Sequence, residues 1–313
     1  MENRLTKTNS NSLITKLKKQ WVLLLMISPS LVLIFIFGTV PLAGLWMAFT
    51  RYKLGKGIFD GQFVGLKNFT RLFIQTGDIG YLLRNTLIVN ITKLIIGSIL
   101  SISFSVFLKE LRSKKFSKFV QTVSFLPYFI SWVIVYSIVA ALVSVNSGAI
   151  NQLLVMTGLA DKGINVLGRE EYAYGLTIFL SQWKGLGYNS VLYLAAMGGI
   201  PPELYEAVAI DGAGRFRSIY YITLPGISAT FCILLIMAIS NIFSSGIDFF
   251  FVFTNSTNWR RMEMFDMYIY SRGLEQGDFS YATAVGLMKS AVGLILLFAA
   301  NKVTKKIAGN GLF

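Results

Sequence analysis

The run "VLLLMISPSLVLIFIFGTVPLAGLWMAF", Val22 to Phe49, contains no charged residue and exceeds the roughly 20 apolar residues that a helix needs to cross a bilayer. Five further runs have the same character. The six predicted spans cover about 22–49, 82–108, 119–145, 172–197, 227–253 and 281–300. Because hydrocarbon cannot satisfy exposed backbone groups, continuous apolar runs of this length favour helices over barrel strands of about ten residues. The sequence therefore predicts an all-α polytopic membrane protein with six transmembrane helices.

The composition agrees with this fold class, because 54% of the 313 residues are hydrophobic, 14% are charged and the mean hydropathy is +0.61. The first run is too long for a signal peptide and no small-residue cleavage site follows it, so we expect it to be retained. The connections between runs are too short to fold as separate domains. We expect one membrane domain over 21–303, with tails at 1–20 and 304–313.

The net charge of +14 arises from basic residues that lie at the ends of apolar runs, so we expect no nucleic acid partner. Cytoplasmic loops of membrane proteins carry an excess of Lys and Arg. The main basic clusters are Arg4–Lys19, Lys109–Lys118 and Lys302–Lys306. They predict that both termini are cytoplasmic, and six spans then place the connection 198–226 on the same side. The connection after the first run is also basic, although this topology places it outside.

Several classes of chemistry are disfavoured. The chain has no histidine, the commonest general base and metal ligand, which argues against a hydrolase or a zinc protease. Its single cysteine, Cys232, has no partner thiol for a disulfide or a metal site. The phosphate-binding pattern G-x-x-x-x-G-K-S/T does not occur. We therefore expect no catalytic residue, no metal and no cofactor in this chain.

Prolines and glycines interrupt the apolar runs. Pro29, Pro41 and Pro127 each remove a backbone donor, and we expect each to kink its helix. The fourth run contains "QWKGLGYNS", Gln182 to Ser190, which allows two interpretations. Gly185 and Gly187 would let helices pack closely, or the polar groups of a loosened helix would line an aqueous path.

The segment "PPELYEAVAIDGAGRFR", Pro201 to Arg217, separates the fourth and fifth runs. Two prolines and an acid predict a helix start. Leu204, Ala207 and Val208 then form one apolar stripe, and Gly212 ends the helix. A helix of about three turns is too short to be stable alone in water, so it requires a partner surface.

This segment resembles the EAA motif of permease subunits in binding-protein-dependent ABC importers. The family pattern is Glu-Ala-Ala, three residues, Gly, nine residues, Ile, one residue and Leu-Pro. The sequence departs from it only at Val208, which replaces the second alanine. "PELYEAVAIDGAG", "WKGLGYNSVLYLAAMGGIP" and "FLPYFISWVIV" further resemble the carbohydrate branch of that family, the last of them its polysaccharide-type permeases. The candidate coupling residues are Glu206, Ala207, Val208, Asp211, Gly212, Ile222, Leu224 and Pro225.

The resemblance implies a mechanism and a set of partners. The EAA segment would be a coupling helix that docks on one of two separate ATPase subunits, which would bind the ATP. A second, similar permease chain and an extracytoplasmic solute-binding protein would complete an importer in a bacterial cytoplasmic membrane. ATP-driven closure of the ATPases would then move the membrane helices as rigid bodies and alternate the access of the substrate.

Charged and aromatic residues at membrane depth are candidates for the substrate pathway. Lys93, Lys184, Asp248 and Lys289 are costly there unless they pair or serve a function. Aromatic rings stack on sugars, and amides bond to hydroxyl groups. The candidate pathway residues are Lys93, Trp183, Lys184, Tyr188, Asn189, Tyr193, Asn241, Asp248 and Phe250.

These observations lead to the hypothesis of a permease subunit of an ABC importer for a carbohydrate, with an oligosaccharide as the expected cargo. The alternative is an ion-coupled secondary transporter of a polar solute, in which Lys93, Lys184 and Asp248 would form the ion relay. That alternative predicts an inverted repeat and gives no reason for the EAA spacing.

Overall fold

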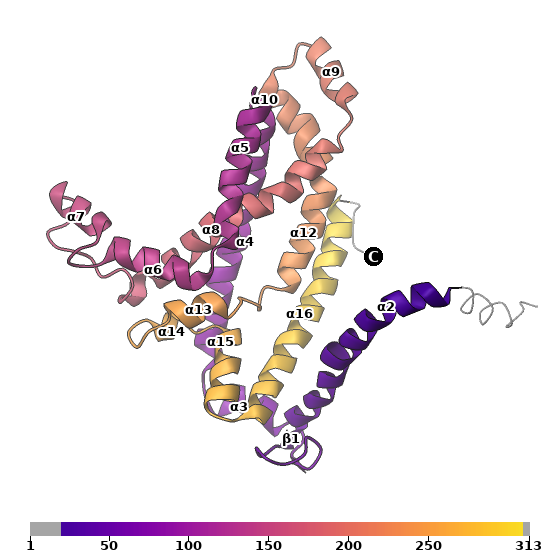
Figure 1. Ribbon diagram of the computed structural model, residues 1–313, viewed down its shortest axis with the longest axis vertical. Coiled ribbons are helices and arrows are strands. Elements are labelled where there is room, and N and C mark those ends of the chain that lie inside the picture. Colours follow the sequence, from indigo (N-terminus) through magenta and orange to yellow (C-terminus); the bar gives the residue numbers. More distant parts are fainter. Residues whose placement is uncertain (1–19, 309–313) are drawn as a thin grey trace, which may run out of the picture.

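The computed structural model describes residues 20–308, so the predicted tail at 1–20 lies almost entirely outside this range and the predicted tail at 304–313 lies half outside it (Figure 1). The expectation of an all-α protein is confirmed. The strands among the described residues are β1 (Thr50–Arg51) and β2 (Gln62–Phe63), which pair antiparallel with Thr50 opposite Phe63. They form a small hairpin at one end of the molecule (Figure 1).

The helices follow one another with short connections. In chain order they are α2 (Trp21–Ile34), η1 (Phe35–Thr39), η2 (Val40–Phe49), α3 (Lys67–Ile74), α4 (Ile79–Glu110), α5 (Lys114–Phe125), η3 (Leu126–Phe129), α6 (Trp132–Val143), α7 (Ala149–Met156), η4 (Glu170–Tyr172), α8 (Ala173–Gly198), α9 (Pro202–Ile210), α10 (Arg215–Ser218), η5 (Ile219–Thr223), α11 (Leu224–Gly226), α12 (Ser228–Ser240), α13 (Asp248–Phe253), α14 (Trp259–Met262), α15 (Phe265–Tyr270), η6 (Ser271–Glu275) and α16 (Phe279–Ala308).

Within residues 20–308, three helical segments are long and apolar enough to cross a membrane, namely Trp21–Phe49, Ile79–Glu110 and Phe279–Lys306. Two bent pairs, Lys114–Phe129 with Trp132–Val143 and Arg215–Gly226 with Ser228–Ser240, raise the number to five if each pair is one span. α8 lies at the position of the expected fourth span and has 26 residues. Its polar side chains, which include Gln182, Lys184 and Asn189, make it less apolar than the others.

Two of the predicted spans are not straight helices. The segment expected over 119–145 bends by 99° between η3 and α6. Pro127 lies in η3, and the Ser131 hydroxyl caps the new helix by accepting from the Ile134 N–H at 3.4 Å, so the kink expected at Pro127 is present. The segment expected over 227–253 is a larger correction. α12 ends at Ser240, and the chain is not helical again until Asp248.

The first span departs from α-helical geometry in its second half. η1 is a π-helical turn immediately before Pro41, a residue that has no backbone donor for a regular helical bond. Pro29 lies inside α2. The side chains of α2 are unburied, and the helix stands apart from the other long helices (Figure 1). Contacts with α16 and α3 begin only in η2.

The body of the molecule is built on two long helix pairs, α4 with α8 and α12 with α16 (Figure 1). α8 also packs on α5, and this crossing depends on a glycine. A Cβ atom at the buried Gly187 would overlap the backbone carbonyl of Ser124. Because α8 continues as a regular helix through the "QWKGLGYNS" stretch, the close-packing interpretation holds for Gly187.

This contact predicts opposite effects for the same substitution at two positions of α8. Ala stabilises an exposed helix position by up to about 1 kcal/mol relative to Gly, and a Cβ at Gly175 would meet open space. Gly175→Ala should leave the melting temperature unchanged or raise it. Gly187→Ala should lower stability by about 1–3 kcal/mol because the new methyl group overpacks the crossing. Thermal unfolding of the detergent-purified variants measures both effects. Equal stabilisation by the two substitutions would contradict the close crossing.

Candidate functional site

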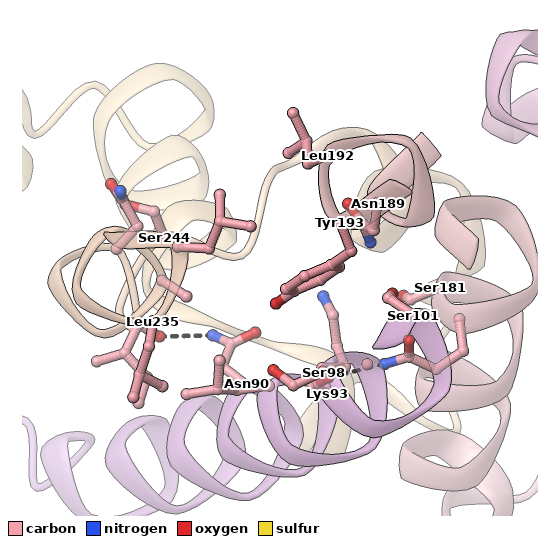
Figure 2. Close-up of a pocket in the computed structure, with 17 residues that line it drawn as sticks. Asn90, Lys93, Ser98, Ser101, Ser181, Asn189, Leu192, Tyr193, Leu235 and Ser244 are labelled. Atoms are coloured by element: carbon pink, nitrogen blue, oxygen red, sulfur yellow. Dashed lines mark hydrogen bonds between the residues drawn. The ribbon is translucent and has the colours of Figure 1, made fainter. Parts of the chain in front are cut away.

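A cavity of about 380 Å³ lies between α4, α8, α12 and the non-helical segment that follows α12 (Figure 2). This volume falls within the range of roughly 300–1,000 Å³ that small-molecule sites occupy. Its apolar lining comes mainly from leucines. The polar lining residues are Asn90, Lys93, Ser98, Ser101, Ser181, Gln182, Asn189, Tyr193, Asn241 and Ser244.

One face of α4 forms a wall of the cavity. Asn90, Lys93, Ser98 and Ser101 follow each other at helical spacing, which places them on one side of the helix. The neighbouring wall, α8, is attached to α4 by two hydrogen bonds. Gln182 Nε2 donates to the Lys93 carbonyl at 2.9 Å. The Ser105 hydroxyl donates to the Ser190 carbonyl at 2.8 Å.

The break after α12 is held at the edge of the cavity by side chains from other helices. Asn90 Nδ2 donates to the Ile242 carbonyl at 2.7 Å and to the Ser245 hydroxyl at 2.8 Å. The Asp266 carboxylate accepts from the Ser245 N–H at 2.8 Å and also pairs with Lys289. These bonds satisfy backbone groups that a continuous helix would have satisfied internally. Lys289, one of the charges predicted at membrane depth, is thus part of an internal ion pair.

The structure brings four predicted pathway residues to this cavity, namely Lys93, Asn189, Tyr193 and Asn241. Asp248 and Phe250 line an adjoining cavity of about 80 Å³ that shares Lys93 and Ser181 with the first. Lys93 therefore lies between the two spaces.

The other three predicted residues lie away from the main cavity. Lys184 lines a hollow of about 790 Å³ together with Asp248, and its amine donates to the Tyr128 carbonyl at 2.5 Å. Tyr188 stacks on Tyr128 with ring centroids 4.1 Å apart. Trp183 is 42% exposed and lines none of these three spaces.

Sequence reasoning missed part of the polar lining. The missed residues are Asn90, Ser98, Ser101, Ser181, Gln182 and Ser244. A signal for the α4 members was available, because small and polar residues recur at helical spacing through the second apolar run. Among the described residues, no group of three or more His, Cys, Asp or Glu side chains is placed to hold a metal ion.

The second candidate site is the loop that contains α9, at the end of the molecule opposite the β hairpin (Figure 1). α9 is fastened to the body by Tyr205. Lys109 Nζ donates to the Tyr205 hydroxyl at 2.5 Å, and that hydroxyl lies 3.0 Å from the Thr223 hydroxyl. Tyr205 and Val208 also pack against a buried cluster that includes Ile222. One side of this nine-residue helix is therefore fixed to α4 and η5.

The opposite side of α9 is exposed. Glu206, Ala207 and Leu204 face outward, while Val208 turns toward the body, so the predicted apolar stripe is divided between two faces. Ile210 and Phe216, in and just after α9, are 86% and 89% exposed. The remaining candidates of this loop, Asp211, Leu224 and Pro225, are exposed as well. The loop therefore presents a carboxylate among large apolar side chains, the composition of a surface that binds protein.

The turn after α9 requires a glycine. Gly212 has a φ of +75°, a left-handed conformation in which a β-branched side chain is strongly disfavoured. The Gly212 N–H donates to the Ala209 carbonyl at 3.1 Å and closes the end of the helix. The predicted helix stop at Gly212 is thus present in the structure.

At the other end of the molecule, buried polar groups fix α14 to α4. Asn85 is fully buried, and its Nδ2 donates to the Arg260 carbonyl at 2.8 Å and to the Glu263 carbonyl at 3.0 Å. The Tyr81 hydroxyl donates to Glu263 Oε2 at 2.6 Å. Burial raises the pKa of the Glu263 carboxyl above its usual 4.5, although the bond from Tyr81 acts in the opposite direction.

Residues 94–309 match the family described as "Binding-protein-dependent transport system inner membrane component". The chain is 41% identical over 307 residues to the polygalacturonan/rhamnogalacturonan transport system permease protein YteP of Bacillus subtilis (strain 168), covering 98% of this chain and 95% of that protein. It is 31% identical over 298 residues to the diacetylchitobiose uptake system permease protein NgcF of Streptomyces coelicolor, covering 85% of this chain and 81% of NgcF.

A solved structure has the same fold. The crystal structure of a bacterial alginate ABC transporter in complex with an alginate pentasaccharide-bound periplasmic protein contains a chain that superimposes with a TM-score of 0.85 at 32% identity. The match covers 95% of this chain and 99% of that chain.

The raised pKa of Glu263 predicts how stability depends on pH. The folded protein holds this proton more tightly than the unfolded chain, so the stabilisation present below pH 4.5 is lost as the pH rises above that value. Between pH 4.5 and pH 7, the melting temperature of Glu263→Gln should therefore fall less than that of the wild type. The control is Glu171→Gln, which alters an exposed carboxylate. The same pH dependence in the wild type and Glu263→Gln would contradict this assignment.

Proposed function

Because the chain belongs to the family of binding-protein-dependent transport system inner membrane components, we propose that it is the permease subunit of an ATP-driven importer that moves an oligosaccharide across a bacterial cytoplasmic membrane. The similar proteins named above are transport permeases, and their names specify polysaccharides or a chitin disaccharide as cargo. The structural relative is part of an alginate ABC transporter, solved with a periplasmic protein bound to an alginate pentasaccharide. These similarities support a saccharide as the substrate class.

The two-sided arrangement of α9 is the observation that carries this proposal. On one side of α9, Tyr205 accepts a hydrogen bond from Lys109 of α4. On the other side, Glu206 and Ile210 are exposed and accessible to another protein. A separate ATPase subunit on the cytoplasmic side is the expected partner, and it would bind the ATP. Closure of two such subunits would move α9 and, with it, the helices that line the cavity.

The cavity between α4, α8 and α12 supplies the passage. Its serine hydroxyls and amide groups are suited to hydroxyl-rich solutes, and the Tyr193 ring offers a surface for stacking on a sugar. Both termini and the α9 loop would lie in the cytoplasm, as the distribution of basic residues predicts. The opposite end would receive a solute-binding protein, as the complex of the alginate transporter with its periplasmic protein suggests.

A second permease chain would complete the path. The side chains of α2 are mostly apolar and none of them is buried, so lipid or another subunit must cover them. The alternative of an ion-coupled carrier receives less support, because Lys93, Lys184 and Asp248 take part in none of the ion pairs seen among the described residues.

Transport by this chain should depend on a partner ATPase. Vesicles that contain the chain with its partner permease, ATPase subunits and binding protein should accumulate the saccharide when ATP is supplied on the ATPase side. Vesicles without the ATPase subunits should show only leakage. Concentrative uptake driven by an ion gradient in the absence of ATPase would overturn the proposal and favour the secondary transporter.

Substitutions in the α9 loop should separate ATPase binding from membrane insertion. Glu206→Lys reverses the exposed carboxylate, and Gly212→Val places a β-branched residue at a φ of +75°. Both variants should insert into the membrane normally but lose co-purification with the ATPase subunits and saccharide-dependent ATP hydrolysis, by roughly tenfold or more if the lost contacts resemble interface hot spots.

Two controls make this measurement specific. Asp161→Lys reverses an exposed carboxylate outside the loop, and it should leave ATPase binding intact. Gly212→Asn should retain most of the binding, because asparagine tolerates left-handed backbone conformations better than other residues. Normal co-purification of both Glu206→Lys and Gly212→Val would contradict the docking role of α9.

A further inference from the structure

Lys93 is the one charged residue among those that line the main cavity. We propose that its ammonium group binds a carboxylate of the transported saccharide, so that the cavity selects sugars that carry carboxylates, the uronates. This inference rests on the proposed transport function and specifies the class of its substrate.

Lys93 lies near the middle of α4, a helix of 32 residues. A charge at this depth is costly and is normally found facing a partner or an aqueous cavity. Lysines near the ends of a transmembrane helix extend their amines to the membrane surface, but a lysine at the centre is too far from it. Figure 2 shows the Lys93 side chain directed into the cavity, as is the Tyr193 ring from α8.

Comparison with Lys289 shows what Lys93 lacks. Lys289, within the span formed by α16, pairs with Asp266. Lys93 takes part in none of the ion pairs seen in the described part of the chain. Asp248 lines the small adjoining cavity together with Lys93, but it does not come within ion-pair distance. The fold thus compensates one intramembrane lysine and leaves the charge of the other to a ligand.

The neighbours of Lys93 complement this role. The side-chain amides of Asn90, Gln182 and Asn241 donate hydrogen bonds to backbone carbonyls. Their side-chain carbonyl oxygens remain as acceptors, which match the hydroxyl groups of a sugar. Acceptors of this kind repel a carboxylate, whereas the Lys93 ammonium attracts it. The cavity therefore combines an acceptor-rich surface for hydroxyls with one cationic position for an acid group.

The test compares an acidic saccharide with its neutral ester in the complete transporter. Trigalacturonate, trimannuronate and triguluronate would each be supplied with its fully methyl-esterified form, which keeps the sugar skeleton and removes the charge. Proteoliposomes would contain this chain as wild type, Lys93→Met or Lys93→Arg, with the same partner permease, ATPase subunits and binding protein. The measured quantity is the ratio of acid to ester uptake. Because the binding protein is identical throughout, a change in this ratio between variants reports on the permease.

The wild type should favour at least one acid over its ester. Lys93→Met should reduce that preference by roughly 10- to 100-fold, the factor typical of a hydrogen bond to a charged group, mainly through loss of acid uptake. Lys93→Arg should retain most of the preference, and the control Lys302→Met, an exposed lysine elsewhere, should retain all of it. Asp248→Asn should also keep the preference for the acid, whereas a purely structural pairing of Lys93 with Asp248 predicts equal losses for acid and ester in both variants.

Two results would overturn the inference and leave the transport function standing. One is ATP-dependent uptake of neutral saccharides with no preference for an acid. The other is an unchanged acid-to-ester ratio in Lys93→Met. Failure of the wild-type assembly to take up any saccharide, acidic or neutral, would instead contradict the proposed function itself, and the inference with it.

Discussion

Hydrocarbon supplies no hydrogen bonds, and this constraint explains where the chain can leave its helices. The break after α12 exposes backbone groups that a continuous helix would have satisfied. Asn90 of α4 donates to the Ile242 carbonyl, and the Asp266 carboxylate accepts from the Ser245 N–H. One of these side chains, Asn90, also lines the main cavity. The opening in the helix bundle and its stabilisation are therefore one structural feature.

The two ends of the molecule are attached to α4 in different ways. Opposite α9, Asn85 and Glu263 join α4 to α14 through buried bonds, which leave that end rigid. At α9, Tyr205 bonds to Lys109 of α4 and lies within hydrogen-bonding distance of Thr223 of η5, while the outward side remains exposed. A force applied to α9 would therefore reach α4, whose other residues line the cavity.

The features that local physics determines were predictable from the sequence. The apolar runs predicted the helices, Pro127 predicted the bend before α6, and Gly212 predicted the end of α9. The break after Ser240 was not predicted, because no proline marks it and its partner Asn90 is 152 positions away. The cavity was predicted in part for the same reason. Lys93 and Tyr193 stand out by residue type, whereas Ser98 and Ser101 acquire a role only when α8 and α12 pack against α4.

The unpaired Lys93 also bears on the energetics of transport against a membrane potential. The interior of a bacterial cell is electrically negative, and each negative charge that enters costs about 2.3 kcal/mol per 100 mV. A trisaccharide with three carboxylates would meet a barrier of about 7 kcal/mol at that potential. The Lys93 ammonium would stabilise one of these charges at the depth where water is scarcest, whereas ATP hydrolysis would supply the electrical work. A charge that costs stability in the empty protein would in this way lower the desolvation cost of its cargo inside the membrane.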